Sequence, residues 1–280
     1  MDTAQEFELS DEDFARARKL IRQFAGIALS DGKRALVYGR LVPRLRHHGL
    51  TRVSSYLEKV ESDSIEREHF VNSLTTNVTD FFREKHHFEA LRTRILPQLY
   101  ARGGPVRIWS AGCSSGEEPY TIGLTVLATP PPPSVDVKIL AADLDSNVVA
   151  RAAEGVYPLS KLEPVSAEDR QRGFFKGRGK QAGFACARPE LKALVHFRQL
   201  NLMAPWPMKG PFDVIFCRNV IIYFDDATRR GLVDRFVTLL APGGVLMLGH
   251  SEAMMGTHRL LRSGGHTMFQ KVAEAMERAA

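Results

Sequence analysis

A glycine-containing turn in residues 106–119, VRIWSAGCSSGEEP, has the residue types needed to hold a nucleotide-like ligand. Residues 106–109 are β-branched and aromatic, which is typical of a buried strand, and Gly112 and Gly116 follow among small residues. Glu118 and an apolar run with helical character come next. A strand, a glycine turn and a helix start in this order present a ligand at the carboxyl end of the first strand of an α/β fold. The spacing G-x-x-x-G does not match a dinucleotide fingerprint, so a ligand turn and a plain strand-to-helix turn both stay open.

Two aspartates follow the next predicted strand, residues 135–141. An acidic side chain at the end of the second strand of such a fold holds the two hydroxyls of an adenosine ribose, and Asp143 has that position. The alternative is that one or both aspartates cap the following helix, because aspartate is a strong N-cap residue. Both interpretations hold if Asp143 faces a ligand and Asp145 caps the helix.

A third polar group follows the clearest strand of the second half, residues 212–217, FDVIFC. Arg218 and Asn219 emerge where this buried strand ends, which is where side chains of α/β proteins line a ligand site. Tyr223 comes shortly afterwards and either belongs to the same site or packs in the core.

The cysteines and histidines do not form a metal-binding pattern. The 280 residues contain three scattered cysteines, too few for a zinc site or a disulfide framework. His86 and His87 are adjacent, so on a helix their rings are not expected to face one ligand together. We therefore expect no metal.

The composition, 44% hydrophobic and 25% charged, is that of a globular protein. No apolar run approaches the roughly 20 residues that span a bilayer, and the acidic N-terminal residues lack the plan of a signal peptide. The cytoplasm is therefore the expected location. The net charge of +6 is compatible with an acidic partner, which could be nucleic acid, an anionic membrane surface or an acidic protein segment.

Residues 1–75 are predicted to be helical. Ser10 is expected to cap a first helix and Gly26 to end it. A second helix is expected from about residue 30 or 31 to residue 48. One face of this second helix carries the basic residues Lys33, Arg40 and Arg44. A solvated charged face and a docking surface for an acidic partner both stay open.

From residue 76 onward, predicted strands and helices alternate, which indicates an α/β fold with a mostly parallel, doubly wound sheet and an antiparallel edge. Residues of about 172–198 interrupt the alternation, with Gly177, Gly179 and Gly183 beside two short β-like runs, 184–187 and 194–197. We interpret this stretch as a small antiparallel insertion. Its edge either accepts a partner strand or forms a lid.

Four segments in this order, LTTNVTDFFRE, IWSAGCSSGEEPY, FDVIFCRNVIIYFD and LAPGGVLMLGHSE, resemble the chemotaxis receptor methyltransferases of the CheR family. The resemblance implies a helical N-terminal domain that docks on the receptor, residues 1–75. It also implies a class I methyltransferase domain that uses S-adenosylmethionine (SAM), residues 76–280, with an inserted β-subdomain at about 172–198. The implied reaction transfers a methyl group from SAM to glutamate side chains of membrane chemoreceptors, giving γ-methyl esters and S-adenosylhomocysteine (SAH).

The resemblance also implies roles for single residues. Arg83 and Tyr223 match residues that the family places close to the transferred methyl group. The positions that match the family's cofactor contacts are Asn77, Thr79, Arg83, Glu118, Asp143, Asn201, Leu202, Arg218 and Asn219.

The implied partners are the chemoreceptors. In the family the basic face of the second helix meets the acidic methylation helices of the receptor, and Lys33, Arg40 and Arg44 stand on that face here. The spacing G-R-G-K-Q-A-G resembles relatives whose β-subdomain binds a short peptide at a receptor C-terminus. The resemblance further implies a monomer.

Two alternative functions belong to other classes. A nucleic-acid methyltransferase is suggested by the basic charge, but the chain lacks an evident aromatic and basic stacking surface or an N-P-P-Y-like loop. A non-catalytic SAM-binding sensor that docks on receptors is the other alternative. The presence of Arg83, Asp143, Asn219 and Tyr223 argues against it.

Overall fold

The computed structural model describes residues 6–252 and 258–272. The chain divides into two compact units. The first extends to Thr76 and includes Tyr223–Asp225, and the second comprises Asn77–Ile222 and the chain from Asp226 onward.

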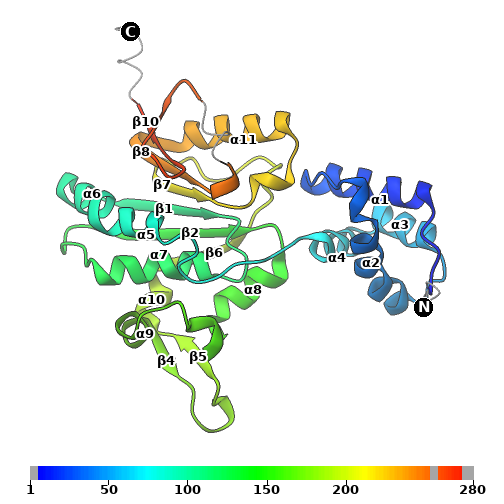
Figure 1. Cartoon of the computed structure of the whole chain (residues 1–280), viewed down its shortest axis with the longest axis horizontal. Coiled ribbons are helices and arrows are strands. Elements are labelled where there is room, and N and C mark those ends of the chain that lie inside the picture. Colours follow the sequence, from blue (N-terminus) through cyan, green and yellow to red (C-terminus); the bar gives the residue numbers. More distant parts are fainter. Residues whose placement is uncertain (1–5, 253–257, 273–280) are drawn as a thin grey trace. The chain divides into compact units, whose positions relative to one another are not determined.

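The described part of the first unit is helical, as predicted (Figure 1). Ser10 Oγ accepts a hydrogen bond from the N–H of Asp13 at 3.0 Å, and Gly26 ends the first helix with a left-handed φ of 72°. The helices are α1 (Asp11–Ala25), α2 (Arg34–His48), α3 (Val53–Ser62) and α4 (Ser64–Leu74), with a 3-10 turn, η1 (Asp31–Lys33), before α2.

A buried carboxylate joins three of these helices. The side chain of Glu66 in α4 is 3% exposed and accepts hydrogen bonds from Arg44 Nη2 at 2.6 Å and from Tyr56 OH at 2.7 Å. His48 Nε2 lies 2.7 Å from the same carboxylate. Burial alone would raise the pKa of Glu66, but the bonds from Arg44, His48 and Tyr56 outweigh it and lower the pKa from 4.5 to about 2.

This ion pair changes the expected docking face of α2. Lys33 and Arg40 are exposed, and Arg40 donates to the carbonyl oxygen of Ser73 at 2.9 Å. Arg44, which the sequence placed with them, points to Glu66 instead and has a side chain that is 19% exposed. An amphipathic projection cannot foresee this pairing, because the acidic partner lies on another helix.

The second unit is built on a seven-stranded sheet of order β6-β2-β1-β7-β8-β10-β9 (Figure 1). The first five strands in that order are parallel, and β10 is antiparallel to both of its neighbours. This confirms the predicted α/β class with an antiparallel edge. The bounds are β1 (Val106–Ala111), β2 (Val137–Asp143), β6 (Val195–Gln199), β7 (Phe212–Cys217), β8 (Leu240–Leu248), β9 (Leu261–Ser263) and β10 (Met268–Lys271).

Helices cover both faces of this sheet, and Figure 1 shows α11 on the opposite side from α7. All six residues of β7 are buried, as expected for a central parallel strand. The helices are α5 (His86–Ala90), α6 (Leu96–Arg102), α7 (Glu117–Ala128), α8 (Ser146–Glu154), α9 (Ala167–Gly173), α10 (Pro189–Leu194) and α11 (Asp226–Leu239), with a π-helical turn, Leu91–Ile95, between α5 and α6. No described helix is long and apolar enough to cross a bilayer.

The small antiparallel sheet differs from the expected insertion at both ends. Its strand order is β3-β5-β4, and β3 (Val156–Pro158) lies well before residue 172. The other strands are β4 (Phe174–Lys176) and β5 (Phe184–Ala187). Residues 195–197 of the second expected run belong instead to β6, which pairs with β2 at the edge of the main sheet, and Leu194 ends α10. An edge strand buries one face only, so its pattern looks like that of a hairpin strand.

The Glu66 network predicts a pH-dependent stability. Glu66→Gln leaves the guanidinium of Arg44 without its charged partner, and we expect a loss of about 3 kcal/mol in unfolding free energy at pH 7. The folded pKa is lowered, so the contribution is fully present above pH 4.5 and declines as pH falls toward 2. Urea unfolding of the full chain, followed by circular dichroism, measures the difference between wild type and variant.

Glu61→Gln is the matched control, because Glu61 also pairs with an arginine, Arg16, but its side chain is 44% exposed. We expect a loss below about 1 kcal/mol for it. Equal losses for both variants, or a Glu66→Gln difference that does not shrink from pH 7 to pH 3, would contradict this account.

Candidate active site

The glycine turn after β1 is bonded to the end of β2. The N–H of Gly112 donates to the carbonyl oxygen of Ala142 at 2.7 Å, and the N–H of Ser114 donates to Asp143 Oδ2 at 2.8 Å. A Cβ on Gly112 would lie 2.2 Å from Cγ2 of Val220, so only glycine allows this approach. Asp143 therefore lies against the glycine turn, at the carboxyl edge of the sheet.

The predicted capping role of Asp145 is confirmed. Asp145 caps α8 by accepting from the N–H of Asn147 at 3.0 Å, and it also accepts from Nδ2 of Asn77 at 2.7 Å. Asp143 is bonded by the N–H of Ser114 and, at 3.0 Å, by that of Asp145. Burial raises the pKa of Asp143, against the opposing effect of these N–H bonds.

Arg218 lies at the centre of the same edge, with a side chain that is 2% exposed. Its Nη1 donates to Glu118 Oε2 at 3.0 Å, and its Nη2 lies 3.2 Å from Glu84 Oε2 and donates to the carbonyl oxygen of Arg83. Glu118 also accepts from Oγ of Ser110 at 2.7 Å. One guanidinium thus joins β7, the start of α7 and the NVTDFFRE segment.

The two carboxylates of this network differ electrostatically. Burial raises the pKa of Glu118 despite the opposing charge of Arg218. Burial also acts to raise the pKa of Glu84, but the charge of Arg218 and the N–H of His250 outweigh it, so the pKa is lowered. The network therefore holds a compensated positive charge in a dry environment.

Left-handed backbone conformations mark the same three segments. The φ angles are 54° at Phe82, 56° at Glu84, 48° at Ser114 and 58° at Asn219. Such conformations cost about 1–3 kcal/mol each and accumulate at functional sites. Their position at the ends of β1 and β7 and in NVTDFFRE supports a site at this edge.

The remaining predicted cofactor residues lie in the same unit. The N–H of Leu200 donates to the carbonyl oxygen of Asp143 at 2.8 Å, which places Asn201 and Leu202 just beyond the end of β2. The carbonyl oxygen of Thr79 accepts from Nζ of Lys161 at 3.0 Å.

The two predicted catalytic residues fall in different units. Arg83 belongs to the second unit, and its Nη1 donates to the carbonyl oxygen of Val78 at 3.0 Å. Tyr223 ends the 3-10 turn η5 (Ile221–Tyr223) and groups with the helical unit. The catalytic role of Tyr223 stays a prediction.

Several residues of this edge were not identified from the sequence. Tyr157 in β3 donates through OH to the carbonyl oxygen of Ser115 at 2.7 Å, and Lys161 reaches Asp80 Oδ1 at 2.8 Å. Tyr157 in the small sheet thus braces the glycine turn, and Lys161, in the 3-10 turn that follows β3, braces NVTDFFRE. Glu84 was not identified from the sequence either. Its partner Arg218 is distant in the sequence, so no local pattern signals the contact.

One cluster has metal-ligand spacing. Donor atoms of Glu84, His86 and His87 lie within 4.8 Å of one another, so the expectation that the two rings diverge was wrong. Burial and then the charge of Arg218 lower the pKa of His87 to about 4, so its ring is neutral at pH 7. A metal ion would have to share Glu84 with the guanidinium of Arg218, and we therefore assign the cluster to the ion-pair network.

Sequence comparisons agree with this geometry. Residues 77–269 match the family model "CheR methyltransferase, SAM binding domain", and residues 12–75 match "CheR methyltransferase, all-alpha domain". Chemotaxis protein methyltransferase 2 of Pseudomonas aeruginosa is 44% identical over 266 residues, covering 95% of each chain. The chemotaxis protein methyltransferase of Escherichia coli is 44% identical over 264 residues, covering 93% of this chain and 91% of that protein.

These matches define a methyltransferase with a SAM-binding domain and an all-α domain. The chain belongs to the CheR methyltransferase family. The predicted family, enzyme class and use of SAM are confirmed, and neither alternative function is favoured.

The residues at the sheet edge fit SAM. Asp143 offers carboxylate oxygens at the position where a ribose is held. Ser114 Oγ is buried and has no hydrogen-bond partner in the described part of the chain, so it can serve a ligand. Gly112, with a φ of 85°, keeps the turn free of side-chain bulk.

Proposed function

We propose that this methyltransferase acts on glutamate side chains of membrane chemoreceptors and produces γ-methyl esters. The names of its relatives support the chemotaxis role. The observation that supports the cofactor site is that the ends of β1, β2 and β7 meet the NVTDFFRE segment at one sheet edge, where Asp143 bonds the glycine turn and Arg218 bonds NVTDFFRE and Glu118. The reaction would take place in the cytoplasm, with the enzyme as a monomer.

The residue roles follow from position and chemistry. Asp143 would accept from the ribose hydroxyls, and Asn77, Thr79, Asn201, Leu202 and Asn219 would line the cofactor. Glu118 and Arg218 are largely occupied by each other, so we propose that they shape the site more than they contact the cofactor.

The acceptor side chain needs no general base. A glutamate has a pKa of about 4.3 and is ionised at neutral pH. SAM supplies a methyl group on a positively charged sulfur, so charge is lost as the methyl moves to the carboxylate. Alignment in a dry site should then supply most of the rate. We propose that Arg83 orients the acceptor carboxylate and that Tyr223 positions it by hydrogen bonding.

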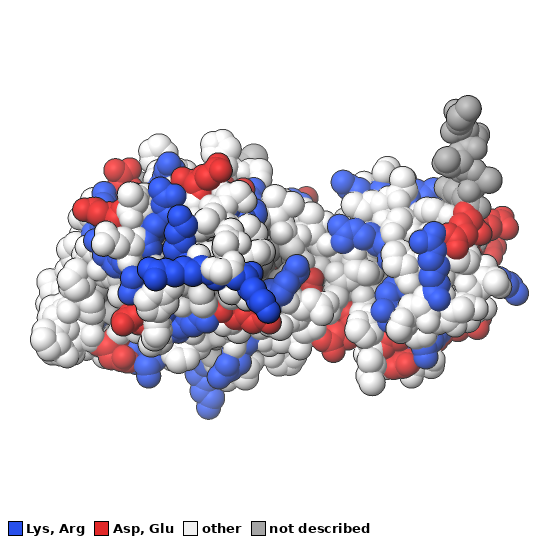
Figure 2. Space-filling model, turned by 90° about the horizontal axis from the view of Figure 1, so that it is seen from below, with Lys and Arg blue, Asp and Glu red and all other residues white. Residues whose placement is uncertain are grey.

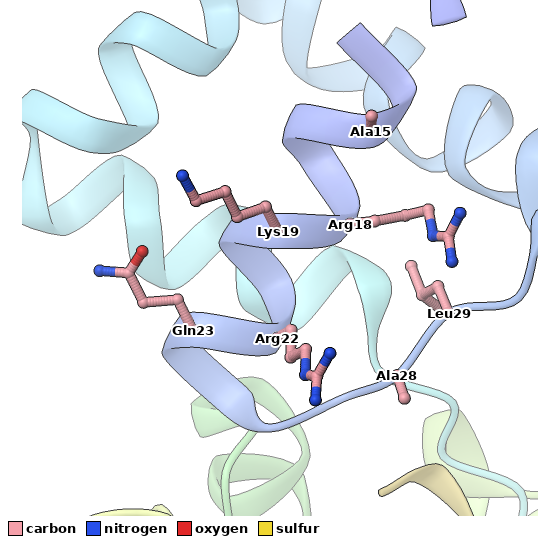
Figure 3. A pocket seen from close by; sticks show the side chains of 7 residues that line it. All are labelled: Ala15, Arg18, Lys19, Arg22, Gln23, Ala28 and Leu29. Atoms are coloured by element: carbon pink, nitrogen blue, oxygen red, sulfur yellow. The ribbon is translucent and has the colours of Figure 1, made fainter. Parts of the chain in front are cut away.

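The receptor would dock on the helical unit through charge. Lys33 and Arg40 are the exposed cations of the predicted face of α2. A hollow of about 600 Å³ in the same unit is lined by three further cations, Arg18, Lys19 and Arg22, and by Ala15, Gln23, Ala28 and Leu29 (Figure 3). Arg18 and Arg22 already pair with Asp31 and Asp225, so Lys19 is the exposed cation of the hollow that would add to the charge of Lys33 and Arg40. None of the predicted cofactor residues lines the hollow.

A receptor C-terminal peptide would bind the small sheet. Its outer strands, β3 and β4, each have one neighbour, and Phe175 and Phe184 are 48% and 42% exposed. The hairpin between β4 and β5 carries exposed Lys176, Arg178 and Lys180. Figure 2 looks onto the side of this hairpin and shows Lys and Arg side chains crossing the near face. An extended acidic peptide that adds a strand fits these features.

The product identifies the substrate class. Incubation with methyl-labelled SAM and receptor-containing membranes should give label that mild base releases as methanol, because γ-methyl esters are base-labile. In the same assay, Tyr223→Phe should lower turnover by about tenfold with SAH affinity unchanged. Base-stable label, or label on nucleic acid, would contradict the glutamyl ester. Full turnover by Tyr223→Phe would contradict only the role of the tyrosine.

If the receptor docks on this face of α2, reversing a charge there should weaken receptor binding and leave cofactor binding unchanged. Arg40→Glu should raise the KM for receptor membranes by about fivefold at low salt, and the effect should shrink as salt rises. Arg46→Glu is the control, because Arg46 is an exposed cation on another face of α2. Equal effects of the two variants, or a changed SAH affinity in Arg40→Glu, would contradict docking on this face.

A further inference from the structure

The carboxylate of Glu252 is buried at the carboxyl edge of the sheet, and Glu252 is not among the residues proposed to bind the cofactor. Glu252 is 1% exposed. Its Oε2 accepts from the N–H of Asn219 at 2.9 Å and from that of Gly249, and its Oε1 accepts from the N–H of Val220 at 3.0 Å and of Ile222 at 3.3 Å. The four donors are all backbone groups, so the carboxylate replaces the pairing that a strand or helix would supply.

These bonds connect the ends of two neighbouring strands. Cys217, the last residue of β7, is paired with Leu248, the last residue of β8. Beyond that pair both strands continue as loops. The carboxylate of Glu252 bonds the N–H of Gly249 in the loop after β8 and the N–H of Asn219 in the loop after β7. These hydrogen bonds therefore fix the backbone of the loop after β7 from the first residues beyond its pairing with β8.

The loop held in this way forms part of the proposed cofactor site. Asn219 has a left-handed φ of 58°, a conformation that needs external support in a residue other than glycine. Val220 packs directly on Gly112 of the glycine turn. Arg218 precedes both and carries the ion-pair network. A displacement of this loop would therefore change the position of the residues that follow both β1 and β7.

We propose that Glu252 is a positioning residue, which fixes Asn219 and the loop after β7 in the shape that binds the cofactor. The inference rests on the proposed cofactor role of Asp143 and Asn219. It also explains why residue 249 is a glycine: a Cβ there would lie 2.7 Å from Oε2 of Glu252 and 2.8 Å from the backbone nitrogen of Asn219.

The carboxylate is required, and a neutral amide of the same size does not replace it. A carboxylate only accepts hydrogen bonds, and here each of its oxygens accepts two. In Glu252→Gln one oxygen becomes an NH₂ group that faces two N–H donors. Two backbone donors are then left unsatisfied, whichever way the amide turns.

The test measures SAH affinity by calorimetry on the full chain, together with thermal unfolding. Glu252→Gln should weaken SAH binding by about tenfold or more, because the unsatisfied donors release the loop. Gly249→Ala, which keeps the carboxylate and disturbs its position, should weaken binding in the same direction. Hydrogen exchange at the amides of Asn219 and Val220 should accelerate in both variants.

Asp213→Asn is the matched control. Asp213 is also a buried carboxylate of β7, 5% exposed, but it lies near the amino end of the strand and accepts from Arg107 N–H at 2.8 Å and Arg102 Nη1 at 2.7 Å. Its variant should lower the unfolding temperature and leave SAH affinity within about twofold of wild type.

Asp143→Asn separates the two ways of failing. If it weakens SAH binding while Glu252→Gln and Gly249→Ala only lower the unfolding temperature, as Asp213→Asn does, the role of Glu252 is overturned and the cofactor site stands. If Asp143→Asn binds SAH like wild type, the proposed cofactor site is wrong, and the inference about Glu252 falls with it.

Discussion

The guanidinium of Arg218 is the interaction on which the cofactor edge depends. It is nearly fully buried between the carboxylates of Glu118 and Glu84, and it also bonds the backbone of Arg83. A buried charge of this kind is tolerated only when its partners are in place, and removal of one partner costs about 3–5 kcal/mol. Arg218 follows β7, and its partners come from the start of α7 and from NVTDFFRE, so this network requires three separate segments to assemble together. The segments that we propose to line the cofactor therefore meet in one arrangement.

Around this ion pair, hydrogen bonds from side chains hold backbone that carries no regular pairing. Asp143 holds the glycine turn and Glu252 holds the loop after β7. The small sheet contributes Tyr157, and the turn that follows β3 contributes Lys161. The small sheet is thus part of the support of the catalytic unit, in addition to any role in peptide binding. Buried carboxylates satisfy the unpaired backbone N–H groups at the end of this sheet, as N-cap side chains satisfy those at the start of a helix.

Local signals predicted the fold well, and contacts between distant segments limited the prediction of the site. The cap at Ser10 and the buried strand β7 could be predicted because each depends on residues that are close in the sequence. Residues 195–197 were assigned to the wrong sheet, because an edge strand and a hairpin strand share one pattern. The ion pairs of Arg44 and Glu84 could not be predicted from the sequence, because their ionic partners lie on other segments. The family resemblance supplied the site residues that spacing alone could not.

A crystal structure of the enzyme with SAH bound tests the central claim most directly. The account predicts the ribose hydroxyls within hydrogen-bond distance of Asp143, the ligand between the glycine turn and Asn219, and Arg218 still paired with Glu118. SAH bound away from this edge of the sheet, or bound there only with the pair between Arg218 and Glu118 broken, would contradict the account.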